Sequence, residues 1–239
     1  MLAADCADGG IVTTGAARGF SCGHVFFPEP TLYLAVNYQL RPSEPDWANV
    51  LCEGSGDSQA IRAFLSPFDA MLEAAYASSP GKPYHVVPAH QYVPSGFLAD
   101  HNGRLALDIQ FGWPAHDGAL ICRRNGSLAA CCKHQEQHVP PERAHHIAVK
   151  VDADTLTAIE RVHENAGLFA YKEAFSRVIG WAEEHRHRAI ATAIQKIPGT
   201  VPSGSECNQI ALYDPEFEQW HFVPSTLLDD LWAESNDIA

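Results

Sequence analysis

Three cysteines and two histidines surround one Asn-Gly turn in the segment "ICRRNGSLAACCKHQEQH", which covers residues 121–138. Thiolate and imidazole are the ligands that zinc prefers in proteins. Eight of the 13 histidines of the chain lie between His85 and His146, in the same region. The residue types alone therefore raise the hypothesis of a metal site.

The geometry expected of this turn argues against that hypothesis. In a two-residue hairpin centred on residues 125–126, Cys122 pairs with Ala129 and becomes a diagonal neighbour of Cys131 on one face. The next cysteine, Cys132, points to the opposite face, together with the histidine two residues later. Four ligands do not converge on such a ribbon, so we predict a plain hairpin of free thiols, with no metal ion and no cofactor.

Three other local patterns lack a component that their chemistry requires. Cys22 and His24 share a face if "FSCGHV" is a strand, but no third group can be named to orient the histidine. The loop "EGSGDSQ" has neither the third small residue of a dinucleotide-binding loop nor the lysine of a P-loop. In "EEHRHR", His185 and His187 are two residues apart, which excludes the HExxH zinc helix.

The density of histidines leaves an enzyme open as an alternative function. Its catalytic groups would be distant in sequence and would come together only in the fold. Such a site would use histidine with a carboxylate or a cysteine, in a hydrolase or a transferase, and would lie within residues 84–146. The candidate histidines are His90, His101, His134 and His138.

The charge distribution favours a protein-binding function. The formal net charge is −13, and residues 197–239 contain eight acids but no lysine or arginine. A field of this sign repels a phosphate backbone and attracts a basic protein surface. We predict a regulatory protein of the inhibitor, immunity or adaptor type. The predicted partner-binding residues are Asp214, Glu216, Glu218, Asp229 and Asp230. An acidic end that only aids solubility is the simpler alternative.

Composition indicates a soluble protein. With 46% hydrophobic and 19% charged residues in 239, the chain is long enough to bury a sizeable core. It has no apolar run of the roughly 18 residues that span a bilayer, and its first residues do not resemble a secretory signal. An odd number of cysteines, seven, favours thiols in a reducing cytoplasm. The excess of arginine over lysine and the many alanines are typical of a GC-rich bacterial genome.

The first half of the chain predicts strands with one helical insert. "TLYLAVNYQL", residues 31–40, has the composition of a buried strand, and "NVLC" that of a short one. We expect a helical insert over about 57–78, kinked where Ser66 caps a helix and Pro67 takes its first position. A β-meander is expected over about 84–133. In it, "RLALDIQF" alternates as a half-buried antiparallel strand, and two Asn-Gly turns form the hairpins.

The second half predicts helices followed by an acidic hairpin. Residues 144–151 have the pattern of a strand, and a helical segment follows over about 154–197. It comprises one helix that is capped near Asp152 or Asp154 and a longer helix over 171–197. Residues 198–239 should form a hairpin that turns at Asp214 and the following proline, and then a helical tail. We therefore predict an α+β fold in a single compact domain, with an antiparallel meander sheet packed against helices.

Overall fold

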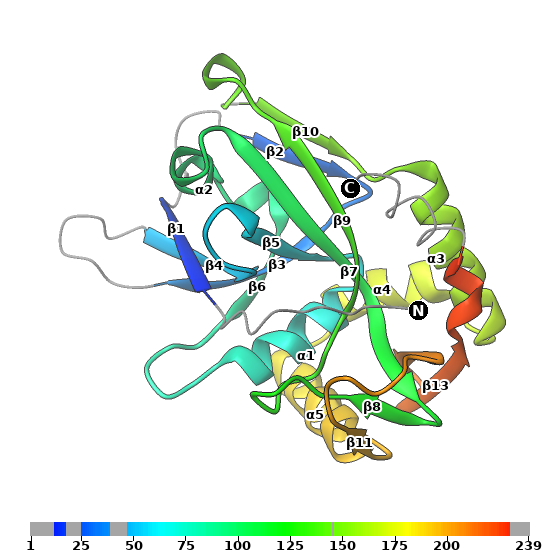
Figure 1. The fold of residues 1–239 in the computed structure, drawn as a ribbon. Helices are drawn as coiled ribbons and strands as arrows, with labels where there is room; N and C mark the ends of the chain where they lie inside the picture. Colours follow the sequence, from blue (N-terminus) through cyan, green and yellow to red (C-terminus); the bar gives the residue numbers. More distant parts are fainter. Residues whose placement is uncertain (1–11, 18–24, 39–46, 145, 230–239) are drawn as a thin grey trace. The chain divides into compact units, whose positions relative to one another are not determined.

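The computed structural model of the protein describes residues 12–17, 25–38, 47–144 and 146–229 (Figure 1). It combines helices with largely antiparallel strands, which confirms the predicted α+β class. No helix within these ranges has the length and hydropathy to cross a bilayer. The contacts of the described residues form two units: an N-terminal unit within residues 12–110 and 132–151, and a C-terminal unit from residues 111–131 and 152–229. That the chain forms one domain stays a prediction.

The N-terminal unit is built on a sheet in which neighbouring strands are mostly antiparallel. One of its pairs, β5 with β7, is parallel, and β10 and β2 form a separate two-stranded parallel sheet. Strands β1, β4, β3, β5 and β7 follow one another across the sheet, while β6 pairs with β3 and β9 with β7. The strands are β1 Val12–Ala17, β2 Val25–Glu29, β3 Tyr33–Tyr38, β4 Trp47–Glu53, β5 Ala60–Phe64, β6 His85–Pro88, β7 Arg104–His116, β9 Cys131–His138 and β10 His146–Lys150.

Helix α1, Pro67–Ala77, covers part of this sheet and begins where the sequence predicts (Figure 1). The side-chain oxygen of Ser66 accepts a hydrogen bond of 3.1 Å from the backbone N–H of Asp69, and Pro67 takes the first helical position. Ala70 and Ala74 then pack into a core with β3, β4 and β5, which is formed by Tyr33, Ala35, Leu51, Phe64, Ala70 and Ala74.

The prediction of a helix is wrong for the first half of the insert. Residues 56–58 form a single 3-10 turn, η1 Gly56–Ser58, and residues 60–64 form strand β5. All five residues of β5 are buried, including Arg62. The strand therefore has no exposed face, and its sequence lacks the alternation of polar and apolar residues that marks a half-buried strand. A short buried run of this kind has the same hydrophobicity pattern in a strand and in a helix, and here strand pairing with β7 decides its form.

Strand β7 is the predicted alternating strand, but it is not half-buried. Its expected polar face includes Ala106 and Gln110, and both have a relative exposure of 0%. The prediction of a meander is also wrong here, because β7 pairs in parallel with β5 and is preceded by helix α2, Ser95–Asp100. A strand inside a sheet, paired on both edges, buries both faces more often than an edge strand does.

The turns at the two ends of β7 correct the predicted hairpins. Asn102 and Gly103 both have positive φ, 52° and 81°, as predicted, but they connect α2 to β7. The hairpin turn lies at Asp117 and Gly118, with φ of 47° and 80°, and joins β7 to β8, Ala119–Ile121. Asp-Gly satisfies a type I′ turn as well as Asn-Gly does, and this one was missed.

The C-terminal unit holds the other strands and three helices of the described chain. Its hairpin β12–β13 confirms the predicted acidic hairpin, and α3 begins at the predicted cap, Asp152. The prediction of one long helix is wrong, because the segment divides into α4 and α5 at Gly180. At this break the backbone N–H groups donate to carbonyl oxygens three residues back. The elements are α3 Ala153–Asn165, α4 Tyr171–Ile179, α5 Glu183–Gln195, β11 Thr200–Val201, β12 Gln209–Asp214, β13 Gln219–Pro224 and η4 Ser225–Leu228.

Aromatic packing holds α5 against the hairpin. Trp220 meets Trp113 edge-on, with ring centroids 5.2 Å apart, and meets Tyr213 at 5.1 Å. Its indole Nε1 donates a hydrogen bond of 3.1 Å to the backbone oxygen of Ala193 in α5. The ring of Trp220 therefore fixes the end of α5 beside strand β13, and this edge forms one wall of the groove described below.

Candidate functional sites

The cysteine-rich turn that raised the metal hypothesis has a different register from the predicted one. Cys122 pairs with Leu128, not with Ala129, and only Gly126 has positive φ at the turn. The pairing is therefore shifted by one residue from the predicted one, and Cys131 begins a separate strand, β9. Among the described residues, no group of three or more His, Cys, Asp or Glu side chains could hold a metal ion.

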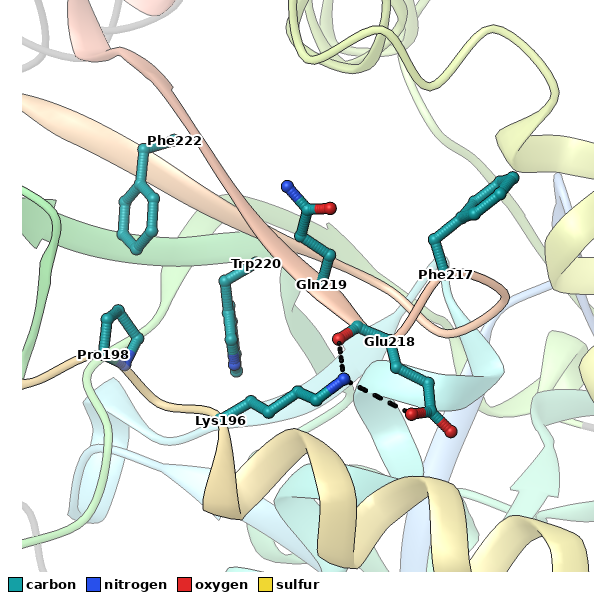
Figure 2. Close-up of a pocket in the computed structure, with 7 residues that line it drawn as sticks. All are labelled: Lys196, Pro198, Phe217, Glu218, Gln219, Trp220 and Phe222. Carbon is teal, nitrogen blue, oxygen red and sulfur yellow. Dashed lines mark hydrogen bonds and ion pairs between the residues drawn. The ribbon is translucent and has the colours of Figure 1, made fainter.

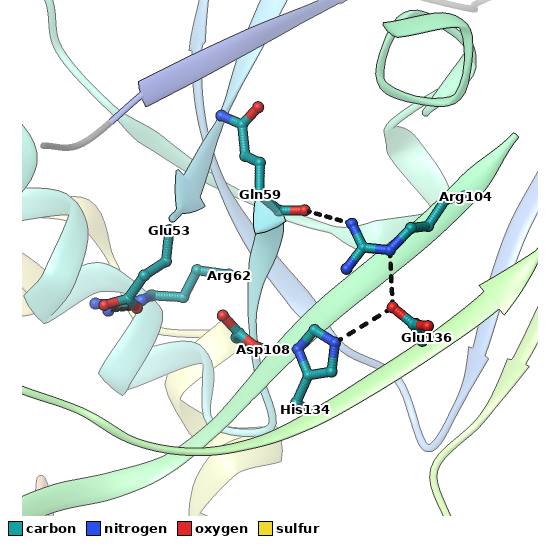
Figure 3. A network of polar contacts seen from close by, with 7 residues as sticks. All are labelled: Glu53, Gln59, Arg62, Arg104, Asp108, His134 and Glu136. Carbon is teal, nitrogen blue, oxygen red and sulfur yellow. Dashed lines mark hydrogen bonds and ion pairs between the residues drawn. The ribbon is translucent and has the colours of Figure 1, made fainter. Parts of the chain in front are cut away.

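Strand β9 instead places polar side chains in a row, since alternate residues of a strand share a face. One of them, His134, joins two carboxylates (Figure 3). Its Nδ1 lies 2.7 Å from Oδ1 of Asp108 on β7, and its Nε2 lies 3.6 Å from Oε2 of Glu136. The His134 side chain is 50% exposed, so solvent reaches the ring.

We call Asp108, His134, Glu136 and Arg104 the His134 network. Contacts within this network shift the pKa values of His134 and Glu136. The hydrogen bond to Asp108 raises the pKa of His134 above its ordinary value. Arg104 donates to Glu136 over 2.7 Å and to the backbone oxygen of Gln59 over 3.3 Å, and its hydrogen bond lowers the pKa of Glu136. A histidine oriented by a carboxylate can take up or release a proton near neutral pH.

The other candidate histidines do not join this network through any described contact. His101 caps α2, with Nδ1 2.7 Å from the backbone oxygen of Phe97, and its ring stacks on that of Phe97 at 4.1 Å. His138 borders Gly103, and His90 is exposed on the 3-10 turn η2, Ala89–Gln91. The pair Cys22 and His24 lies outside the described residues.

A buried ion-pair cluster lies beside the His134 network (Figure 3). Arg62 pairs with Glu53 on β4, and its Nη1 lies 2.6 Å from Oε1 of Glu73 on α1. Burial disfavours the Arg62 charge, but the carboxylates of Glu73 and Glu53 outweigh it and raise the guanidinium pKa. Arg62 is the register partner of Asp108 in the pairing of β5 with β7. The sequence pattern did not indicate this cluster, because Arg62 was predicted to lie in a helix.

The four predicted partner-binding acids that the structure describes do not form one free acidic surface. Asp214 is buried, and its Oδ1 accepts hydrogen bonds from the backbone N–H groups of Glu216 at 2.8 Å and Phe217 at 3.2 Å. This carboxylate therefore holds the hairpin turn. Glu216 pairs with Arg177 of α4. Asp229 is exposed, and Asp230 lies outside the described residues.

A groove lies between the hairpin β12–β13 and the end of α5 (Figure 2). It is open, with a volume of about 430 Å³. Lys196 extends along it, and its ammonium donates to the backbone oxygen of Glu218 over 2.9 Å and lies 3.3 Å from Oε2 of the same residue. The residues that line the groove are Lys196, Pro198, Phe217, Glu218, Gln219, Trp220 and Phe222.

Two exposed phenylalanines line a second hollow, and one of them, Phe217, also lines the groove. Phe217 at the hairpin tip is 78% exposed and Phe169 before α4 is 77% exposed, and the hollow has a volume of about 100 Å³. Large apolar side chains with this exposure are unusual on a soluble protein surface and often mark contact sites. The aromatic residues in "PEFEQWHF" were the available sequence signal, since they interrupt an otherwise acidic segment.

No family model, curated protein or solved structure matches this chain. The function must therefore be inferred from the chemistry of the groove and of the His134 network.

Proposed function

We propose that the protein binds a basic segment of a protein partner, with a lysine or arginine side chain of the partner seated in the groove of Figure 2. The observation that carries this proposal is the position of Lys196. Its alkyl stem runs along the groove, and its ammonium contacts the backbone oxygen and the carboxylate of Glu218. The groove thus already holds a side chain of the chemistry that a basic partner would offer.

The surroundings of the groove support a basic occupant over an acidic or nucleic-acid one. Aromatic walls suit an aliphatic stem, and a carboxylate beside a carbonyl suits an ammonium or a guanidinium. Residues 197–239 add eight acids and no basic residue, and such a field disfavours a phosphate backbone. Phe217 would give the partner an apolar anchor next to the charged contact.

This proposal narrows the predicted partner-binding surface. Of the five predicted acids, Glu218 lines the groove and would exchange its contact with Lys196 for the cation of the partner, whereas Asp214 holds the turn. A surface of this kind suits an inhibitor, immunity or adaptor protein. The thiol state of the five described cysteines is compatible with a cytoplasmic location.

Binding of a basic peptide should perturb the indole of Trp220. We expect acetylated hexalysine to shift the Trp220 Nε1–H resonance in a saturable way, and hexaglutamate to leave it unchanged. Attraction between exposed charges is screened by salt, so affinity should fall at least about fivefold between 50 and 500 mM salt. NMR titration measures both effects, with Trp220→Phe used to assign the resonance.

Two matched charge variants distinguish binding in the groove from non-specific attraction to the acidic segment. Glu218→Gln should weaken hexalysine binding at least about fivefold, because a hydrogen-bonded charge contact is lost. Glu206→Gln makes the same change at an exposed position outside the groove and should have little effect. Equal losses in the two variants, or an indole resonance that does not respond, would refute the proposal.

The His134 network supports a second function, hydrolysis or group transfer. Asp108 orients the ring through Nδ1, as a carboxylate orients a catalytic histidine, and leaves Nε2 on the side of Glu136. In this hypothesis His134 is the general base, and its neutral form acts above a pKa that Asp108 raises.

His134→Gln should abolish any such activity. Loss of a general base costs about 10²–10⁴-fold in rate, so the variant should lose at least that much in the hydrolysis of p-nitrophenyl acetate or p-nitrophenyl phosphate. His90→Gln, at an exposed histidine, is the control and should keep the full rate. Rates that are equal in the wild type and His134→Gln would exclude the enzyme hypothesis for these two substrate classes.

A further inference from the structure

The second hollow, of about 100 Å³, lies within the C-terminal unit and is built mainly from rings. Its walls come from the loop between α3 and α4, from α4 itself and from the turn of the hairpin β12–β13. We call it the aromatic hollow, since five phenylalanine and tyrosine side chains line it: Phe169, Tyr171, Phe175, Tyr213 and Phe217. Surfaces of this kind favour a flat, largely apolar occupant.

A buried histidine lines the same hollow and adds one polar feature to it. His163 of α3 is 5% exposed, with Tyr171 stacked on its ring at 4.0 Å and Phe175 edge-on at 5.9 Å. Its Nδ1 lies 2.8 Å from the backbone oxygen of Ile159, which can only accept, so Nδ1 carries the proton.

The second ring nitrogen of His163 is therefore an acceptor. Burial lowers the pKa of His163 to about 4, so the ring is neutral at pH 7 and its lone pair is on Nε2. Within the part of the chain that the structure describes, no group donates a hydrogen bond to Nε2. A buried acceptor of this kind selects an occupant that brings its own donor.

Size and charge restrict that occupant further. A cavity of roughly 150 Å³ holds a benzene ring, so the hollow takes one six-membered ring between the exposed Phe169 and Phe217 rather than a larger indole. The two carboxylates that line the hollow are already bound, Asp214 by the backbone of the turn and Glu216 by Arg177. Neither is free to neutralise a cation, and a neutral ring with one donor fits best.

We propose that the aromatic hollow binds a tyrosine side chain of a protein partner, whose phenol O–H donates to Nε2 of His163. This inference rests on the proposed function and deepens it. Phe217 lines both the groove and the aromatic hollow, so a partner segment with a basic residue in the groove would place a nearby tyrosine in the hollow. The segment recognised is therefore one that combines lysine or arginine with tyrosine.

Two uncharged probes that differ only in the phenol hydroxyl test the hollow. N-acetyltyrosinamide should bind the full-length chain at least about fivefold more tightly than N-acetylphenylalaninamide, since the second probe leaves the buried acceptor without a donor. NMR titration gives both affinities. The ¹⁵N resonance of His163 Nε2 should shift when the tyrosine probe binds and stay in place with the phenylalanine probe.

Variants assign the contacts. His163→Phe keeps a ring but removes the acceptor, so it should bind the two probes equally. Phe169→Ala, at a residue 77% exposed, should weaken both probes at least about threefold and keeps the test open if His163→Phe fails to fold. Ile179→Ala, at an exposed apolar residue of α4 outside the hollow, is the matched control and should bind both probes like the wild type.

Equal affinities of the wild type for the two probes, or tighter binding of N-acetyllysinamide than of N-acetyltyrosinamide, would overturn the inference. Since the two test probes carry no charge, their result is independent of the hexalysine titration. A Trp220 resonance that responds to hexalysine, with no binding of N-acetyltyrosinamide, refutes the tyrosine site alone. Binding of N-acetyltyrosinamide at His163 with no response to hexalysine refutes the basic groove alone.

Discussion

Replacing Arg62 with methionine should lower the free energy of unfolding by about 3–5 kcal/mol at pH 7, because breaking a buried ion pair strands its partner charges. Glu73 is buried on α1, and Glu53 is mostly buried at the end of β4. Methionine fills a similar volume but offers no hydrogen-bond donor to either carboxylate. Chemical denaturation followed by tryptophan fluorescence measures the loss.

A second variant separates the stranded charges from the loss of packing. Arg62→Met with Glu73→Gln replaces the closest buried carboxylate by a neutral amide and should recover at least half of the lost stability. A loss below about 1 kcal/mol in Arg62→Met would contradict the assignment of Arg62 as the charge that holds this core together.

The parts of the fold that the sequence predicts are those set by neighbouring residues. Ser66 and Asp152 accept hydrogen bonds from backbone N–H groups three residues on, and Asp214 accepts from those two and three residues on, so a short window contains each whole interaction. The errors occur where distant pairing decides. Strand β5 becomes a strand because β7 pairs with it, and no local pattern carries that information. The break at Gly180 is an exception, since the local glycine was outweighed by helical spacing of apolar residues on both sides.

The candidate sites show the same division. His134 was a sequence candidate, but its partner Asp108 was placed on the polar face of a different strand, and only the pairing of β9 with β7 brings the two together. Residue types thus identified what could react, and strand register decided which groups meet.

Two buried titratable residues should give the chain opposing responses to pH. Burial raises the pKa of Asp69 to about 7 and lowers the pKa of His163 to about 4. Asp69 lies on α1 in the N-terminal unit. His163 lies on α3 in the C-terminal unit, where its ring stacks on that of Tyr171. Stability depends on pH wherever the folded and unfolded chains bind different numbers of protons.

For Asp69, folded chains keep a proton that unfolded chains release between about pH 4 and 7, so stability falls as the pH rises through this window. The total effect is about 4 kcal/mol, reached above pH 7. Asp69→Asn mimics the protonated acid and removes this dependence. The variant should therefore be more stable than the wild type at pH 8 and nearly equal to it at pH 4.

For His163 the sign is reversed. Unfolded chains bind a proton between about pH 4 and 6.5 that folded chains exclude, so stability falls by about 3 kcal/mol as the pH drops through this window. His163→Gln keeps a side-chain donor for the backbone oxygen of Ile159, which His163 Nδ1 approaches to 2.8 Å, and removes the titration. The loss of ring packing lowers the free energy of unfolding equally at every pH. A change in the slope of stability against pH therefore reports the titration of His163 alone.

Denaturation curves at closely spaced pH values from 4 to 8 test both assignments together. In the wild type the two slopes nearly cancel between pH 4 and 6.5, each being about 1.4 kcal/mol per pH unit and of opposite sign. Asp69→Asn should therefore become acid-sensitive, while His163→Gln should lose stability as the pH rises. His90→Gln, at an exposed position, should follow the wild-type curve. If either buried variant keeps the wild-type slope, that residue is not held in the native state with a burial-shifted charge.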